Sequence, residues 1–335
     1  MRDVGITTTL PVEVILAAGR RPVDLNNRFI GSDRAQARVE LAEQRGFPRT
    51  ICSWVKGLYG TILEDGIRTV VGVTQGDCSL THALLEVLHT EGVEVVRFEY
   101  PYDRDEATLE REIARFEKAF GVRRAATEEV RADLAPARAD LAAVDEAMGH
   151  GLRAGLSQRA HLAILSGSDL GGDAERFASD VAALREELEG AEARDREFAG
   201  VRLALAGVPP IVDGLFEHTE RRGARIVVSE MAREFAMIRP GAASVVAQYG
   251  AYTYPYDVFY RVEELGRVCR RRRVDGVIHY VQSFCYRGVQ DRILKESIGL
   301  PVLTLECDRP GPLDGSSVTR LEAFIEMLDE KRGGK

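Results

Sequence analysis

Short apolar runs alternate with amphipathic stretches near the amino end of the chain. The runs 4–8, 68–74 and 93–98 are rich in β-branched residues and predict strands, and a further extended piece covers 22–25. The stretches 12–18, 53–63 and 80–89 have helical periodicity. Strands that alternate with helices are typical of βαβ units on a parallel sheet.

The same alternation returns in the last third of the chain. Strands are predicted at 201–206, 224–228, 276–280 and 302–305. Helices are predicted at 211–222, 262–272, 289–297 and 319–330, with a less regular Tyr-rich stretch at 252–260. The two ends therefore share an architecture, although they show no evident sequence identity.

The middle of the chain has a different composition. Residues 105–199 form long, charged stretches rich in Ala and Leu, and strand patterns nearly vanish there. Sustained heptads are missing, so a solvated helical connector is favoured over a coiled coil that binds a partner. The prediction is an α/β protein with an N-terminal α/β domain (1–104), a helical connector (105–199) and a C-terminal α/β domain (200–335). Both outer domains are expected to be open parallel sheets of the Rossmann or flavodoxin type.

Composition and charge narrow the classes of function. The 335 residues are 45% hydrophobic and 29% charged, which is ordinary for a globular protein. A net charge of −8 disfavours nucleic-acid binding, because a basic face is needed to displace phosphate counterions. The first residues lack the pattern of a secretory leader, and no apolar run reaches the roughly 18 residues of a spanning helix. We expect a cytoplasmic protein.

The cysteines provide the candidate chemistry. There are five, Cys52, Cys78, Cys269, Cys285 and Cys307, and none forms a C-x-x-C pair. Cys78 and Cys285 lie between a predicted strand and the following helix, and Cys52 lies at a helix start. Ligands bind at that edge of open parallel sheets, and helix amino ends favour the thiolate that ligates metal.

The alternative for any isolated cysteine is a small buried residue. That role is favoured for Cys269, inside the helical stretch ELGRVCRRRR, while Cys307 ends a strand and fits either role. Three thiolates suit a zinc site that lacks one ligand or an iron–sulfur cube with one iron left open. His82 and His279 could complete zinc, but both also fit as ordinary helix and strand residues. The residues alone leave the metal open.

Two segments of the chain resemble the 2-hydroxyacyl-CoA dehydratase / benzoyl-CoA reductase family. The run VDGVIHYVQSFCYRGVQDRILKESIGLPVLTLECDRP, followed by SSVTRLEAFIEML, is similar to the end of that family, and LPVEVILAAGRRPVDL is similar to its opening. Cys52 and Cys78 fall where the family has its first two cluster cysteines. The residues that match the C-terminal pattern are Asp275, Gly276, Cys285, Gly299, Pro301, Leu303, Glu306, Asp308, Thr319, Arg320, Glu322, Ala323, Phe324, Glu326 and Leu328.

The resemblance implies a [4Fe–4S] cluster held by Cys52, Cys78 and Cys285 in a cleft between the domains. One iron would be left for a non-cysteine ligand or substrate. It also implies an ATP-dependent iron–sulfur activator protein that delivers single electrons, a homo- or heterodimer, and an acyl-CoA substrate dehydrated or reduced through a ketyl radical. Asp77, Gln282 and Tyr286 are polar neighbours that could tune the cluster's potential or simply cap loops.

Three alternatives stay open. Some relatives carry a larger double-cubane iron–sulfur cluster and reduce small molecules, which would require thiolates beyond the three matched here. The chain could also be a non-catalytic cluster carrier or structural paralogue. A third alternative is a two-domain protein that binds a small ligand without metal.

Overall fold

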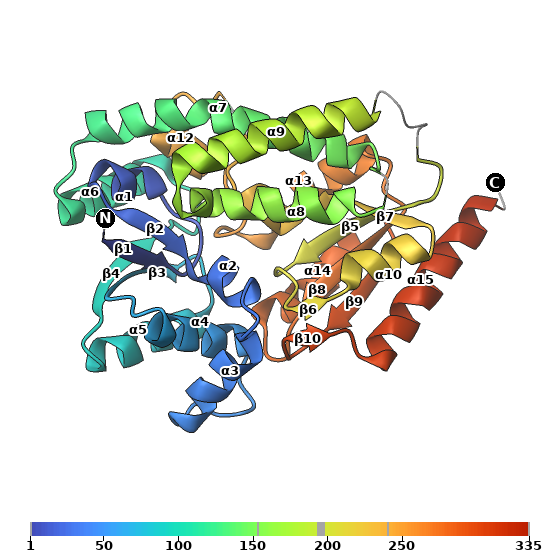
Figure 1. Ribbon diagram of the computed structural model, residues 1–335, viewed down its shortest axis with the longest axis horizontal. Coiled ribbons are helices and arrows are strands. Elements are labelled where there is room, and N and C mark those ends of the chain that lie inside the picture. The colour runs from blue at the N-terminus through green and yellow to red at the C-terminus, as the bar shows by residue number, and fades with distance from the viewer. Residues whose placement is uncertain (1, 153, 193–197, 240, 334–335) are drawn as a thin grey trace. The chain divides into compact units, whose positions relative to one another are not determined.

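The computed structural model describes residues 2–152, 154–192, 198–239 and 241–333. The chain forms two compact units (Figure 1). Unit 1 comprises Met1–Ala139, Ser166–Ser179 and Glu234–Asp257. Unit 2 comprises Asp140–Leu165, Asp180–Arg233 and Val258–Lys335. None of the helices in the described ranges is long and apolar enough to cross a membrane.

Unit 1 is built on a four-stranded sheet in which every pairing is parallel. Its order is β2-β1-β3-β4. The strands are β1 (Asp3–Ile6), β2 (Arg21–Asp24), β3 (Thr69–Gln75) and β4 (Glu94–Glu99). β3 is a central strand, and its valines are fully buried, which is why it reads as a continuous β-branched run rather than an alternating one.

Helices cover both faces of this sheet, with α1 and α6 on one side and α4 and α5 on the other (Figure 1). The helices within unit 1 are α1 (Val12–Ala17), α2 (Leu25–Ile30), α3 (Ala35–Gln44), α4 (Ser53–Glu64), α5 (Ser79–Thr90), α6 (Glu106–Phe120) and α12 (Val245–Gly250), with two 3₁₀ turns, η1 (Ser166–Ser168) and η2 (Leu170–Gly172). Two further helices, α7 (Arg124–Gly149) and α9 (Ala174–Glu192), contribute to both units.

Unit 2 repeats the arrangement. Its four-stranded parallel sheet has the order β7-β5-β8-β9, and a small second sheet pairs two short strands. The strands are β5 (Val201–Gly207), β6 (Val212–Asp213), β7 (Ala224–Ser229), β8 (Gly276–Val281), β9 (Val302–Glu306) and β10 (Gly311–Pro312). The helices are α8 (Leu156–Leu165), α10 (Leu215–Arg221), α11 (Glu230–Phe235, which continues into unit 1), α13 (Val258–Arg271), α14 (Tyr286–Ser297) and α15 (Gly315–Gly333).

The predicted fold class is confirmed, because both sheets are open, parallel and flanked by helices. Some of the predicted helix boundaries were wrong. The predicted helix 211–222 begins instead at Leu215, after the short strand β6, because Gly214 adopts a left-handed φ of 82° that starts the helix later. The helices α2, α3, α11 and α12 were not predicted. Within 105–199 the structure describes residues 105–152, 154–192 and 198–199, most of which lie in α6, α7, α8 and α9, and these helices are divided between the two units. Residues 153 and 193–197 of the predicted connector lie outside the described residues. Its role as a separate connector stays a prediction.

A buried carboxyl pair fixes the 3₁₀ turns of unit 1 to β2. The amide of Asp24 donates to Oδ2 of Asp169 at 2.7 Å, and the Ser168 hydroxyl donates to Oδ2 of Asp24 at 2.5 Å. Both aspartates are buried. Burial, together with the nearby charge of Asp24, raises the pKa of Asp169 to about 7. One proton is therefore held by this pair over much of the acid range.

We predict that Asp169→Asn flattens the dependence of unfolding free energy on pH. An unfolded aspartate ionises near pH 4, so the folded protein loses stability as pH rises from about 4 through the folded pKa of Asp169. Asn copies the protonated carboxyl, so the variant should be more stable than the parent at pH 8 by roughly 2–4 kcal/mol and nearly equal at pH 4.

Denaturant titrations of both proteins at pH 4 and pH 8, followed by circular dichroism, check this prediction. The matched control is Asp329→Asn, since Asp329 is exposed on α15. Equal pH slopes for the parent and Asp169→Asn would contradict a shared proton at this pair.

Candidate functional site

Both sheets have one topological switch point. In unit 1 the chain leaves β1 toward β2 on one side and leaves β3 toward β4 on the other, so the loops after β1 and β3 separate at the carboxyl edge. In unit 2 the loops after β5 and β8 separate in the same way. Ligands of open parallel sheets bind outside the carboxyl ends of the strands at such a point. The two switch points are therefore the positions at which to look for chemistry.

Cys78 lies at the switch point of unit 1. It follows β3 and occupies the N-cap of the twelve-residue helix α5, where its Sγ accepts from the Leu80 amide at 3.4 Å. Asp77 accepts from the Cys78 amide at 2.7 Å and from the Thr81 hydroxyl at 3.2 Å. The turn requires glycine at position 76, because its φ is 101° and a Cβ there would lie 2.7 Å from Pro255. These contacts fix the backbone position from which the Cys78 side chain extends.

Cys285 occupies the matching place in unit 2. It follows β8 and is the N-cap of α14, another twelve-residue helix. The preceding loop is tied to the end of β9, since Ser283 donates from its amide to Asp308 at 2.6 Å and from its hydroxyl to Glu306 at 2.8 Å. Phe284, just before the cysteine, has a left-handed φ of 62° and is 78% exposed. Uncommon backbone conformations of this kind gather at functional loops.

Cys52 is the third predicted ligand, and it too is an N-cap, at the start of α4. α4 also has twelve residues and packs against α5 within unit 1. Cys52, Cys78 and Cys285 are all half-buried. Each of the three cysteines therefore stands at the amino end of a helix, the end that carries a partial positive charge.

The other two cysteines are buried and differ chemically. Cys269 packs in the core of unit 2 on α13, and burial raises its pKa to about 12. Burial also raises the pKa of Cys307, whose Sγ lies 3.7 Å from the Ser317 hydroxyl. Within either unit, the described residues contain no group of three or more His, Cys, Asp or Glu side chains gathered as in a metal site.

The two histidines considered as metal ligands differ in burial and in their neighbours. His82 is exposed on α5 and lines an open pocket of about 480 Å³ together with Asp77 and Ser79. His279 is buried on β8, and its Nδ1 lies 2.8 Å from Asp291 of α14. Burial lowers the pKa of His279, so the ring is neutral and ties the strand before Cys285 to the helix after it.

Sequence reasoning missed a buried ion pair below the switch point of unit 2. Glu230, at the start of α11, accepts two hydrogen bonds from Arg261 at 2.6 and 2.7 Å, and a third from the Gly207 amide at 3.2 Å. Burial alone would raise the pKa of Glu230, but the Arg261 guanidinium holds it below its usual range. A Cβ at Gly207 would overlap the carbonyl oxygen of Tyr280, so β5 ends in contact with β8. The sequence signal that could have found this ion pair is a glutamate, Glu230, directly after the buried strand β7.

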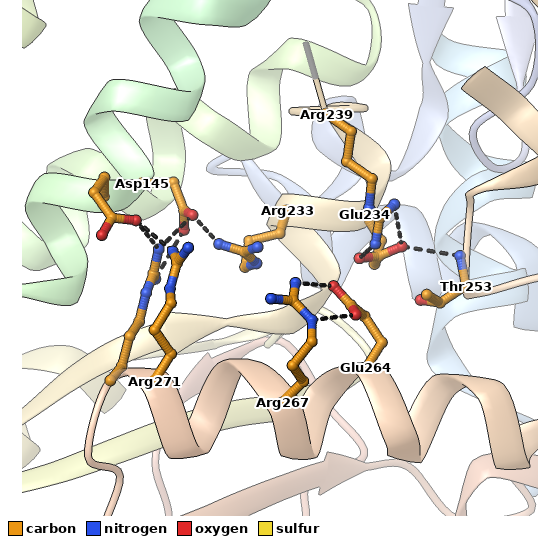
Figure 2. A network of polar contacts seen from close by, with 10 residues as sticks. Asp145, Arg233, Glu234, Arg239, Thr253, Glu264, Arg267 and Arg271 are labelled. Carbon is orange, nitrogen blue, oxygen red and sulfur yellow. Dashed lines mark hydrogen bonds and ion pairs between the residues drawn. The ribbon is translucent and has the colours of Figure 1, made fainter. Parts of the chain in front are cut away.

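A second network fixes the end of α7 within unit 2. Asp145 accepts from Arg233, as Figure 2 shows, and both its oxygens accept from Arg272 at 2.6 and 3.1 Å. Arg272 also donates to the Val227 carbonyl at 2.8 Å and so reaches the sheet. In unit 1, Glu234 accepts from Arg239 and from the Thr253 amide at 2.9 Å (Figure 2). These buried charges are paired, as burial demands.

The fold and these positions define a class of protein. It has two open parallel α/β units, each with a cysteine that starts a helix at its switch point. The family model described as 2-hydroxyglutaryl-CoA dehydratase, D-component, matches residues 7–328, and the chain belongs to this family. The resemblance found in the sequence is thereby confirmed. Comparison with curated proteins finds no match.

We predict that thiol alkylation separates the cysteines into two groups. In native iron-free protein at pH 8, iodoacetamide should modify Cys52, Cys78 and Cys285 at least about tenfold faster than Cys269 and Cys307, because the buried thiols are shielded and remain protonated. Mass spectrometry of tryptic peptides at several times measures each rate. Modification of all five at one rate after denaturation is the control. A native rate for Cys269 as fast as that for Cys78 would contradict the assignment.

Proposed function

We propose that this chain is an iron–sulfur-dependent subunit of the 2-hydroxyacyl-CoA dehydratase type. Its [4Fe–4S] cluster would be held by Cys52, Cys78 and Cys285. The observation that supports this proposal is the shared placement of the three thiols, each half-buried at the N-cap of a twelve-residue helix. Two of them stand at the switch points of their sheets, where α/β proteins bind ligands.

The donor set fits such a cluster. Three thiolates leave one iron for a non-cysteine ligand or for substrate, which suits a catalytic rather than a purely structural centre. When bound, the cluster would supply single electrons at low potential to an acyl-CoA thioester. The chain's own part is to orient the ligands: Asp77 fixes the backbone of Cys78, and Asp308 fixes the loop before Cys285.

The burial of the remaining thiols argues against a double-cubane cluster. A larger cluster would need further thiolates, and only Cys269 and Cys307 remain in the chain. Both are buried, and burial raises the pKa of each. A thiol in such surroundings resists the deprotonation that ligation requires.

Electrons would reach this centre from a separate ATP-dependent activator, and the subunit would act in a homo- or heterodimer. Two large apolar side chains are exposed beside Cys285, Phe284 at 78% and Val289 at 80%. Exposed apolar residues next to a redox centre suit the docking of an electron donor. This surface supports the proposal that electrons enter near Cys285.

We predict that Cys52→Ser, Cys78→Ser and Cys285→Ser each lose most of their bound iron. Removal of one of three thiolates leaves an iron without its protein ligand. Anaerobic reconstitution followed by iron and sulfide analysis and visible absorption measures the loss. Cys269→Ser and Cys307→Ser are matched controls and should retain iron. Full cluster content in any of the first three variants would remove that residue from the ligand set, and a colourless, iron-free parent would favour a metal-free binding protein.

We also predict that reduction of the cluster requires ATP. The parent protein, mixed anaerobically with the family's activator and a reductant, should be reduced much faster with ATP than without it. Visible absorption follows the reaction, and a non-hydrolysable ATP analogue provides the control. Equal rates with and without ATP would eliminate the ATP requirement and favour a non-catalytic cluster carrier.

A further inference from the structure

Cys52 differs from the other cysteine of unit 1 in how its position is fixed. The thiol of Cys78 caps its own helix, whereas that of Cys52 does not cap α4. The loop before Cys52, residues 45–52, contains turns but no helix or strand. Within it, the Ile51 amide reaches the Pro48 carbonyl only at 3.4 Å, which is long for a hydrogen bond. The position of Cys52 therefore depends on contacts between this loop and the helices beside it.

One buried lysine provides such contacts. Lys56 lies one turn into α4 and is 3% exposed. Its ammonium donates to the carbonyl of Arg49, in the loop, at 3.1 Å and to Oε1 of Glu43, near the end of α3, at 2.7 Å. A single side chain therefore joins α3, the loop and α4, and it holds the backbone just before Cys52 from a position just after it.

The helices on either side of the loop are themselves fixed. A Cβ at Gly60 of α4 would overlap the carbonyl oxygen of Arg38 on α3, so the backbones of these two helices touch. A Cβ at Gly57 would likewise overlap the ring of Phe29 on α2. Because α4 packs without clearance against both neighbours, Lys56 connects a rigid helix to the loop.

Packing alone does not explain a lysine at this position. Burial of an ammonium is costly unless it is paired, and apolar side chains of similar volume often replace buried ion pairs without loss of stability. An apolar side chain cannot, however, bind the Arg49 carbonyl and the Glu43 carboxylate at defined positions. The contacts of Lys56 therefore point to a requirement for one loop geometry.

We propose that Lys56 is a positioning residue for Cys52, and that it holds residues 49–52 in the conformation in which the thiol ligates the cluster. This inference rests on the proposed function. Contacts behind a metal ligand orient it and raise the affinity for metal. Since Lys56 acts through the backbone of one loop, its loss should be felt at Cys52 and not at Cys78.

Two matched variants test the inference. Lys56→Met removes the ammonium and keeps a long, unbranched side chain. Arg38→Met is the control, because Arg38 is also a buried cation between α3 and α4, but its guanidinium contacts Thr61 and Asp65 toward the carboxyl end of α4. Glu43→Gln is a milder variant, which removes the charge of the ion pair and leaves the contact of Lys56 with the Arg49 carbonyl in place.

Four measurements are compared among these proteins. Iodoacetamide labelling of iron-free protein, followed by mass spectrometry, gives the alkylation rate of each cysteine. Iron release to EDTA is timed on anaerobically reconstituted protein, and the electron paramagnetic resonance spectrum of its reduced cluster is recorded. Thermal melting of the iron-free protein reports general stability.

Lys56→Met should speed the alkylation of Cys52 by at least about fivefold and leave Cys78 and Cys285 within about twofold, because only the loop before Cys52 loses its anchor. It should also release iron about tenfold faster and alter the spectrum of the reduced cluster. Glu43→Gln should change the Cys52 rate in the same direction by a smaller factor. Arg38→Met should lower the Tm at least as far as Lys56→Met does, yet keep Cys52 alkylation and iron release within about twofold of the parent.

Two results would overturn the inference. One is an unchanged Cys52 alkylation rate in Lys56→Met. The other is an equal acceleration in Arg38→Met, which would mean that the lysine only stabilises the α3–α4 pair. If Lys56→Met does not fold, Glu43→Gln decides, and a Cys52 rate equal to that of the parent overturns the inference. A parent that binds no iron would instead remove the proposed cluster, while the alkylation rates of the iron-free protein would still decide the role of Lys56.

Discussion

Parallel strand pairing is the constraint on which the rest of this structure depends. Neighbouring parallel strands cannot be joined by a tight turn, so every strand ends at the same edge and passes through a loop into a helix. In each unit the order of the strands then separates two of these loops at one point. The amino end of a helix stands at that point, with unpaired amides and a partial positive charge. The cysteines at 78 and 285 occupy this one position in both units.

The carboxyl edge of each sheet also explains where several buried charged groups lie. Residues just past the strand ends, such as Glu230 and Asp77, face the unpaired amides of the loops and the helices that follow. Burial is costly for a carboxylate, so Glu230 is stable there only because Arg261 supplies two hydrogen bonds and an opposite charge. His279 is likewise neutral and oriented by Asp291. These groups hold the loops around Cys285 in a fixed geometry.

The sequence predicted the sheets well and the polar interior poorly. The valine-rich run at β3 and the apolar run at β8 identify central parallel strands by composition alone, and the position of Cys78 or Cys285 follows from the strand before and the helix after. The order of the strands within each sheet cannot be derived from local composition, because it depends on contacts between segments that are distant in the sequence. The pairing of Asp24 with Asp169 joins side chains that are 145 residues apart in the sequence, and no local pattern encodes it.

Conflict between stability and function distinguishes the two kinds of cysteine. Cys269 packs in the core of unit 2 and contributes to the stability of the fold. Cys78 is half-buried at the amino end of α5, where its thiol adds little to the core. Proteins retain such residues where binding compensates for the stability that they forgo. The position of Cys78 at the β1–β3 switch point is therefore the strongest reason to propose that the chemistry of unit 1 lies there.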